Sequence, residues 1–253
     1  MDSSCLSRLA TALDSRVEDL DWHMQCFLGE CKVRLKGARV LDVGAGKGPV
    51  SMYAACCEAR QVVSLEPEAA GSTRGVRDEY ESLRDLLHLP QCELLAVDVM
   101  VYCPEEPFDL VLLHDSINHI REVTTDIRRD GPAREAQRQV VAKLASLTRL
   151  GGWLVISDCS RRNFFNDIGL GSPWPFARRI GWRKHQTPSA WCDLLREEGL
   201  QPGTVSRYVP RKLGAIALIV GSAAFNYFTY SWFALRAHRP ESACLRGFSG
   251  GRS

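Results

Sequence analysis

The sequence predicts an α/β domain with a doubly wound, mainly parallel sheet at its centre. Short apolar runs alternate with helical segments along most of the 253 residues, and this alternation is typical of parallel sheets covered by helices on both faces. Several apolar runs are continuous, as expected for strands buried on both sides. A glycine-rich turn, residues 44–48, follows the first run and precedes a helical segment, which is the usual place for a ligand-binding loop.

Composition and charge are those of an ordinary globular protein. Hydrophobic residues make up 45% and charged residues 25% of the chain. The formal charge of +2 is too small to indicate a nucleic-acid partner. The first 22 residues are partly acidic and have no long apolar run, so they do not resemble a signal peptide. The ten cysteines form no CxxC pattern, which favours reduced thiols in a cytoplasmic protein over disulfides or zinc.

The spacing of apolar residues assigns the elements of the first half. Leu6, Leu9 and Leu13 recur at helical intervals, so residues 4–34 are expected to form one or two amphipathic helices. The next segments, read from apolar runs and from breaks at glycine and proline, are a strand at 37–43, a helix at 48–59, a strand at 61–66, a helix at 72–88 and strands at 92–99 and 108–114.

The second half continues the same pattern. Pro132 marks the first turn of a helix over residues 132–149. Thr187 and Gly199 suit the N-cap and C-cap of another helix. The expected strands of this half are residues 151–158, 203–209 and about 226–237.

A charge-free stretch, residues 213–235, allows three interpretations. It is long enough to span a bilayer, but glycines and an asparagine interrupt it, and its second half has the aromatic content of a strand. The favoured interpretation is a buried helix followed by a core strand. Peripheral membrane contact through residues 211–235 is the main alternative, and a transmembrane span is the lesser one.

The glycine turn carries the strongest functional signal. Gly44, Gly46 and Gly48 lie in VLDVGAGKG between a strand and a helix, where glycine lets a ligand approach the backbone. Glu66 ends the next strand, and its carboxylate can accept hydrogen bonds from two ribose hydroxyls. These features predict a nucleoside-containing ligand, either a dinucleotide or S-adenosylmethionine (SAM).

The motifs resemble those of the class I SAM-dependent methyltransferases, in the ubiquinone-type and small-molecule natural-product branch. Asp42 and the three glycines match the first motif, DVGAGKG. Glu66 in SLEPE and Asp98 in AVDVM match the next two acidic positions. FDLVLLHDS and GGWLVISD match the motifs at the fourth and fifth strands. The resemblance implies SAM as cofactor, S-adenosylhomocysteine as product, and His114 and Asp115 beside the cofactor.

The resemblance also implies a Rossmann-like sheet of seven strands with the last strand antiparallel. The expected organisation is an N-terminal helical extension (1–36), a SAM-binding domain (37–240) and a flexible tail (241–253). Within the domain, residues 161–186 are long for a connection. A long loop in a compact domain is commonly functional, so this insert is expected to form a lid.

LLHDSINHI, residues 112–120, is the candidate catalytic segment. Methyl transfer to a hydroxyl needs a base near the carboxyl ends of the strands. The resemblance implicates His119 as base or substrate-orienting group, with His114 as the second candidate. A rival interpretation places Mg²⁺ between Asp115 and Asp158, but residue 159 is a cysteine where an asparagine would be needed. No metal is expected.

Aromatic residues in and beyond the insert predict the acceptor. The expected contacts are Phe164, Phe165, Trp174, Trp182 and Tyr227. They indicate a small hydrophobic or aromatic acceptor, with O-methylation slightly favoured over N-methylation because a histidine suits a hydroxyl proton. The alternatives are a membrane-associated lipid or quinone methyltransferase and a SAM-binding protein that does not methylate. The sequence does not predict an oligomeric state.

Overall fold

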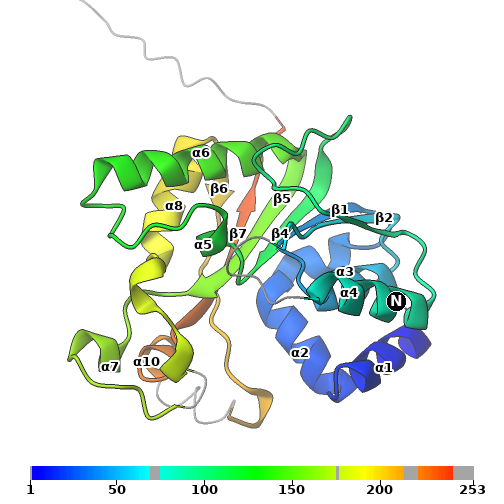
Figure 1. Cartoon of the computed structure of the whole chain (residues 1–253), viewed down its shortest axis with the longest axis horizontal. Coiled ribbons are helices and arrows are strands. Elements are labelled where there is room, and N and C mark those ends of the chain that lie inside the picture. The colour runs from blue at the N-terminus through cyan, green and yellow to red at the C-terminus, as the bar shows by residue number, and fades with distance from the viewer. Residues whose placement is uncertain (1, 69–74, 175–176, 214–221, 242–253) are drawn as a thin grey trace, which may run out of the picture.

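The computed structural model describes residues 2–68, 75–174, 177–213 and 222–241. A seven-stranded sheet forms its middle layer, in the order β3-β2-β1-β4-β5-β7-β6 (Figure 1). The strands are β1 (Arg39–Val43), β2 (Gln61–Leu65), β3 (Cys92–Leu95), β4 (Phe108–His114), β5 (Thr148–Cys159), β6 (Gln201–Pro202) and β7 (Trp232–His238). Strands β1 to β5 are parallel, whereas β7 runs antiparallel to both β5 and β6. The predicted Rossmann-like sheet with an antiparallel last strand is confirmed.

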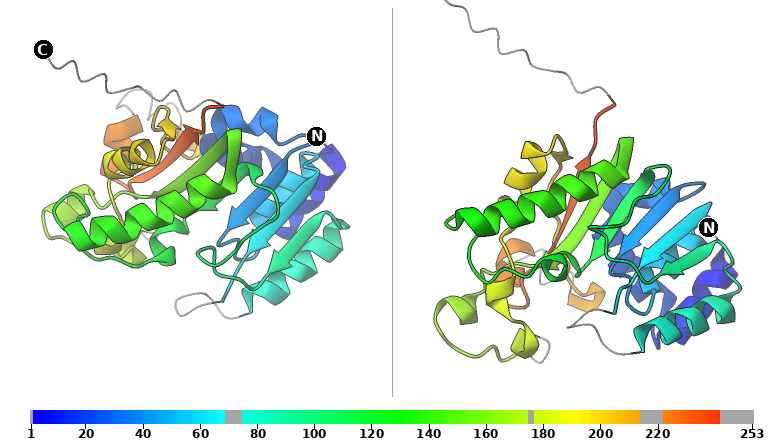
Figure 2. Two further views of the ribbon diagram at one scale, coloured as in Figure 1. Left: turned by 90° about the horizontal axis from the view of Figure 1, so that it is seen from above. Right: turned by 45° about the horizontal axis from the view of Figure 1, so that its top comes forward.

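Helices cover both faces of the sheet (Figures 1 and 2). The longer ones are α1 (Ser3–Ala12), α2 (Val17–Leu28), α3 (Pro49–Cys56), α4 (Val76–Leu87), α6 (Gly131–Leu147) and α8 (Pro188–Glu197). The shorter ones are α5 (Ile117–Ile120), α7 (Phe164–Asp167) and α10 (Ser222–Tyr227), with 3-10 turns η1 (Gly29–Arg34), η2 (Ala177–Arg179), η3 (Trp182–Lys184) and η4 (Arg211–Leu213).

Each central strand contributes to two cores because successive side chains point to opposite faces. Val40 belongs to the core under α1 to α4, and the next residue, Leu41, belongs to the core under α6 and α8. The N-terminal helices are part of the first core, since Leu9 and Phe27 are fully buried there. The predicted helical extension is therefore packed on the sheet.

Three predicted strands are shorter than expected. The run 92–99 is a strand only to Leu95, and the run 203–209 contributes an isolated bridge from Ser206 to Ala234. The aromatic run 226–237 becomes a strand only at Trp232, because its first residues end α10. There, the Asn226 carbonyl accepts a hydrogen bond from the Ser231 N–H at 2.8 Å, which closes a turn that strand periodicity could not reveal.

The charge-free stretch divides between these elements. Its residues 214–221 lie outside the described part of the chain, as do residues 242–253 of the predicted tail. Ala223 and Ala224 of α10 are exposed, so this end of the expected buried helix lies at the surface. Among the described residues, no helix is both long and apolar enough to cross a membrane.

One cysteine prediction is wrong. Cys5 and Cys56 form a disulfide that joins α1 to α3, with 5.5 Å between their Cα atoms. The two residues are 51 positions apart, and only the packing of α1 on α3 brings them together, so no local spacing motif announced the pair. The other cysteines of the described residues are free.

Candidate active site

The carboxyl ends of the parallel strands form the edge at which the predicted site residues gather. The glycine turn connects β1 to α3, and all three of its glycines have positive φ. A Cβ on Gly44 would lie 2.6 Å from Cβ of Ser116, and one on Gly48 would lie 2.5 Å from the Tyr80 ring. Near Gly46 such an atom would meet nothing within 4 Å. Gly44 and Gly48 thus permit close packing, while Gly46 leaves the open side of the turn accessible to a ligand.

Glu66 lies beside this turn, at the end of β2. Its Oε2 accepts a hydrogen bond from the Gly46 N–H at 2.9 Å, and its Oε1 accepts one from the Glu68 N–H at 3.1 Å. The carboxylate is 5% exposed. The contact fixes the acidic side chain and the glycine turn relative to each other.

Asp42 lies behind the turn and not at its open side. Its Oδ2 accepts a hydrogen bond from Ser51 Oγ at 2.6 Å, and Ser51 continues through Ser64 to the Tyr80 hydroxyl. Burial raises the pKa of Asp42 to about 6. Asp42 therefore supports the turn through a buried network, whereas Asp98 lies exposed after β3 and accepts a hydrogen bond from the Met100 N–H.

Asp115 joins three strands at the same edge. It follows β4 with φ +55°, and its Oδ1 accepts hydrogen bonds from Ser157 Oγ and Trp232 Nε1, both at 3.0 Å. Among the described residues, no group of three histidines, cysteines or acidic residues could hold a metal ion. Asp115 is thus bonded to β5 and β7, and Asp158 bonds to His185 through Oδ1.

A histidine pair connects α2 to the end of β4. The Nε2 atoms of His23 and His114 are 2.8 Å apart, and Tyr208 and Trp232 pack against the His23 ring. Burial lowers the pKa of His23 to about 4, and the neighbouring His114 adds to this effect. The sequence offered His23, with Trp22 and Met24, as a candidate wall of the acceptor site, but it did not predict the pair with His114.

The low pKa of His23 predicts a loss of stability in mild acid. The folded protein holds His23 neutral, whereas the unfolded chain takes up a proton near pH 6.5. The stability that depends on a neutral His23 is therefore fully present above pH 6.5 and is lost as the pH falls toward 4. The full loss corresponds to about 3 kcal/mol of the free energy of unfolding. Urea unfolding from pH 7.5 to 4.5 should show a shallower pH dependence for His23→Gln than for wild type. His88→Asn, at an exposed histidine, should leave the slope unchanged, and equal slopes for all three proteins would contradict the assignment.

A second histidine is held by a buried carboxylate at the end of β5. His185 Nδ1 lies 2.8 Å from Asp158 Oδ1, and Asp158 is 1% exposed. Burial raises the pKa of Asp158, while the bonded His185 opposes that shift. Asn118 Nδ2 lies 3.4 Å from the same imidazole nitrogen. Asn118 is a buried residue within α5.

Two polar atoms around this dyad have no hydrogen-bond partner among the described residues. They are Asp158 Oδ2 and Asn118 Oδ1, and both are buried. Unpaired buried acceptors of this kind are rare, and a bound donor commonly explains them. His119, the base expected from the sequence, is exposed. The structure thus adds His185 as a candidate base. The sequence did not reveal the pair, because 27 residues separate His185 from Asp158.

Most of the expected acceptor-binding residues form one aromatic cluster with α10. The Phe164 ring contacts the rings of Phe165, Tyr227 and Phe228 at centroid distances of 5.2, 6.2 and 4.8 Å. Trp174 Nε1 donates to the Phe228 carbonyl at 2.8 Å. Trp182 lies in η3. The insert therefore packs against α10 and is ordered by short helical turns.

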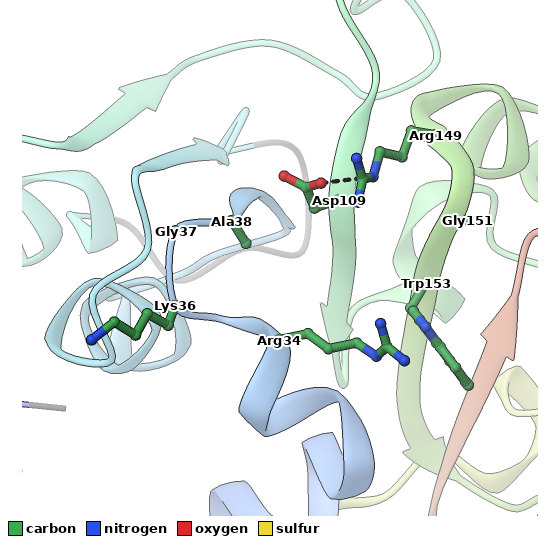
Figure 3. Close-up of a pocket in the computed structure, with 8 residues that line it drawn as sticks. All are labelled: Arg34, Lys36, Gly37, Ala38, Asp109, Arg149, Gly151 and Trp153. Atoms are coloured by element: carbon green, nitrogen blue, oxygen red, sulfur yellow. Dashed lines mark ion pairs between the residues drawn. The ribbon is translucent and has the colours of Figure 1, made fainter.

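A separate hollow of about 280 Å³ opens at the opposite edge of the sheet (Figure 3). Arg149 Nε pairs with Asp109 at 2.7 Å there, and Arg34 stacks on the Trp153 ring at 5.4 Å. The lining residues are Arg34, Lys36, Gly37, Ala38, Asp109, Arg149, Gly151 and Trp153. They lie at the amino ends of β1 and β4 and in the first part of β5, so this hollow is not part of the candidate site.

Solved structures share this fold. A protein of Listeria monocytogenes described as a SAM-dependent methyltransferase matches with a TM-score of 0.59 at 14% identity, over 88% of this chain and 99% of its own. Magnesium protoporphyrin IX methyltransferase from Synechocystis, with bound S-adenosylhomocysteine, gives 0.56 at 16% identity over 94% and 95%. The cyclase SpnF gives 0.56 at 14% identity over 87% and 83%.

Sequence comparison identifies the family. No curated protein matches the chain significantly. A family model described as a methyltransferase domain matches residues 20–204, which include the glycine turn, Glu66 and the Asp158–His185 pair. Together with the seven-stranded fold, this match shows that the chain belongs to the class I SAM-dependent methyltransferases.

Proposed function

We propose that the enzyme transfers the methyl group of SAM to an oxygen atom of a small hydrophobic or aromatic acceptor. The observation that carries this proposal is the Asp158–His185 pair at the carboxyl end of β5. An imidazole held by a buried carboxylate is suited to accept a hydroxyl proton, since the carboxylate fixes its tautomer and stabilises the imidazolium. Proton acceptance is needed for a hydroxyl acceptor as methyl transfer proceeds.

The proposed cofactor site follows the glycine turn. SAM would approach the backbone at Gly46, and its ribose hydroxyls would donate to Glu66. Asp98 would lie near the adenine, with His114 and Asp115 bordering the cofactor on the β4 side. The fully buried position of Asp42 makes it a support for the turn. The bound S-adenosylhomocysteine of the Synechocystis structure supports a nucleoside site in this fold.

The chain's own residues then have separable roles in an in-line displacement. The sulfonium of SAM supplies a good leaving group, so alignment of the acceptor is the main requirement. His185 takes the acceptor proton on Nε2 while Nδ1 stays bonded to Asp158. Asn118 orients the acceptor or the imidazole. His119, the base expected from the resemblance, remains a second candidate, and His114 a third.

The acceptor class rests on the aromatic insert. Phe164, Phe165, Trp174, Trp182 and Tyr227 stay predicted acceptor contacts. Transfer to nitrogen is the closest alternative reaction. A SAM-binding role without methylation is another alternative, since the cyclase SpnF has a similar fold. A cytoplasmic location stays part of the proposal, although the Cys5–Cys56 disulfide is more usual in oxidising compartments.

The reaction can be tested with matched acceptors. Purified protein should be incubated with SAM and with pairs of aromatic compounds that differ only in a hydroxyl or an amino group. Mass spectrometry should find methyl ethers, and S-adenosylhomocysteine should form in equal amount. The reaction should persist in excess EDTA. Methylated amines with no ethers would refute O-transfer, and SAM binding without S-adenosylhomocysteine from any acceptor would favour the non-methylating alternative.

A further inference from the structure

Large apolar side chains are exposed together on the insert and at the residue that follows α10. We call them the apolar rim: Ile168, Leu170, Trp174 and Phe228, which are 49%, 61%, 42% and 47% exposed. The other large apolar residues with such exposure in the described part of the chain are scattered over separate elements. Single exposed apolar residues are normal, but a group on one surface indicates a binding surface. In Figure 1, α7 and α10 lie side by side, as the ring contacts between them require.

Hydrogen bonds and ring contacts hold the residues of the rim in place. Trp174 is anchored through its indole N–H to the Phe228 carbonyl, and Phe228 packs on Phe164. Asn163 Nδ2 donates to the Thr229 carbonyl at 2.7 Å from within the core. The exposed side chains therefore project from an ordered aromatic cluster.

Charge is distributed unevenly around the rim. Residues 159–186 and 203–231 contain nine basic residues and one acidic residue, a formal charge of +8, whereas the rest of the chain has 23 basic and 29 acidic residues, a charge of −6. The single acidic residue, Asp167, is bound by Arg162 and by the Tyr227 hydroxyl. Arg178 donates to the Ser172 carbonyl at 3.1 Å, which keeps its guanidinium close to Trp174. Arg211 and Lys184 pair with Asp19 and Glu122 from other parts of the chain, and the remaining basic residues leave these two ranges with an excess of positive charge.

This surface adjoins the candidate active site. Residue 160 follows β5 and residue 231 precedes β7, and the Ser160 N–H donates to the Ser231 carbonyl at 2.8 Å. The next residue, Trp232, bonds to Asp115. A ligand bound at the rim would therefore lie on the side of the molecule where the strand ends open.

We propose that the apolar rim docks the enzyme on an anionic membrane surface. Apolar and aromatic side chains surrounded by arginine and lysine suit the boundary between lipid headgroups and acyl chains. Each basic residue close to an anionic leaflet adds attraction. A second copy of this chain is a poorer occupant, because it would place two regions with an excess of basic residues against each other. This inference goes beyond the proposed reaction and does not depend on the identity of the base.

Vesicle sedimentation of the full chain tests the proposal. Vesicles of phosphatidylcholine with phosphatidylglycerol should bind the protein, and binding should weaken at high salt. Leu170→Ser should lower the partition coefficient about tenfold, since burial of one leucine accounts for at least that factor. Leu86→Ser, at a residue of similar exposure on α4 (58%), should bind like wild type.

The other outcomes are equally decisive. Equal binding of the Leu170 and Leu86 variants, or no binding of the wild type to anionic vesicles, would overturn the proposal. So would light scattering that shows a dimer dispersed by Leu170→Ser, because the rim would then be a contact between copies. SAM affinity of both variants, measured by calorimetry, should equal that of wild type. If the wild-type protein binds SAM normally but does not bind vesicles, the docking surface is refuted and the proposed reaction is left intact.

Discussion

Replacing His185 with asparagine lowers kcat for methyl transfer to a hydroxyl acceptor by about 10²- to 10⁴-fold, the usual contribution of a general base. The Kd for SAM stays near the wild-type value, because His185 contacts Asp158 and Asn118 and not the glycine turn. Single-turnover kinetics with saturating SAM measure the effect. Asp158→Asn should give a smaller loss of the same kind, since it keeps the shape of the pair but removes the charge that favours the imidazolium.

The acidity of the acceptor distinguishes a base from a structural residue. A strongly acidic phenol is already ionised at neutral pH, so its methylation should be much less sensitive to His185→Asn than that of an ordinary phenol. A loss of equal size for both phenols would mean that His185 only shapes the site. His119→Ala is the matched competitor: a large loss there, with His185→Asn fully active, would return the role of base to the exposed histidine.

Replacing Glu66 with alanine raises the Kd for SAM about 100-fold. Hydrogen bonds to a charged group contribute about 1.5–3 kcal/mol each, and Glu66 also accepts the Gly46 N–H of the turn. The turnover at saturating SAM should change little, because the carboxylate lies away from the Asp158–His185 pair. Calorimetric titration with SAM and with S-adenosylhomocysteine measures the change in Kd for each ligand.

Glu68 provides the control for this experiment. It is exposed and follows Glu66 by two residues, so Glu68→Ala removes the same charge from the same region. The Kd of this variant should stay within a few fold of wild type. Equal weakening by both substitutions would show that general electrostatics and not a ribose contact holds the cofactor, and would refute the assigned role of Glu66.

The sequence by itself determined the fold class and predicted the residues that we propose for the cofactor side of the site. Continuous apolar runs separated by helical segments can be satisfied only by a sheet with two covered faces, and Val40 and Leu41 point to those two faces. The glycine turn and Glu66 are readable because each depends on local geometry: a positive φ, and a position at the end of a strand. Strand lengths were less readable, since α10 and the turn that follows it delay the start of β7 to Trp232.

Only the tertiary structure brought together the residues that we propose for the acceptor side. His23, His185 and the Cys5–Cys56 pair join segments that are far apart along the chain. Each of these residues depends on burial and on a partner from another element, and the spacing of apolar residues along the chain reveals neither. The expected base His119 shares a local motif with the site but lies exposed, whereas His185 acquires its carboxylate partner from β5. A sequence pattern records which side chains a segment offers, but packing decides which of them meet.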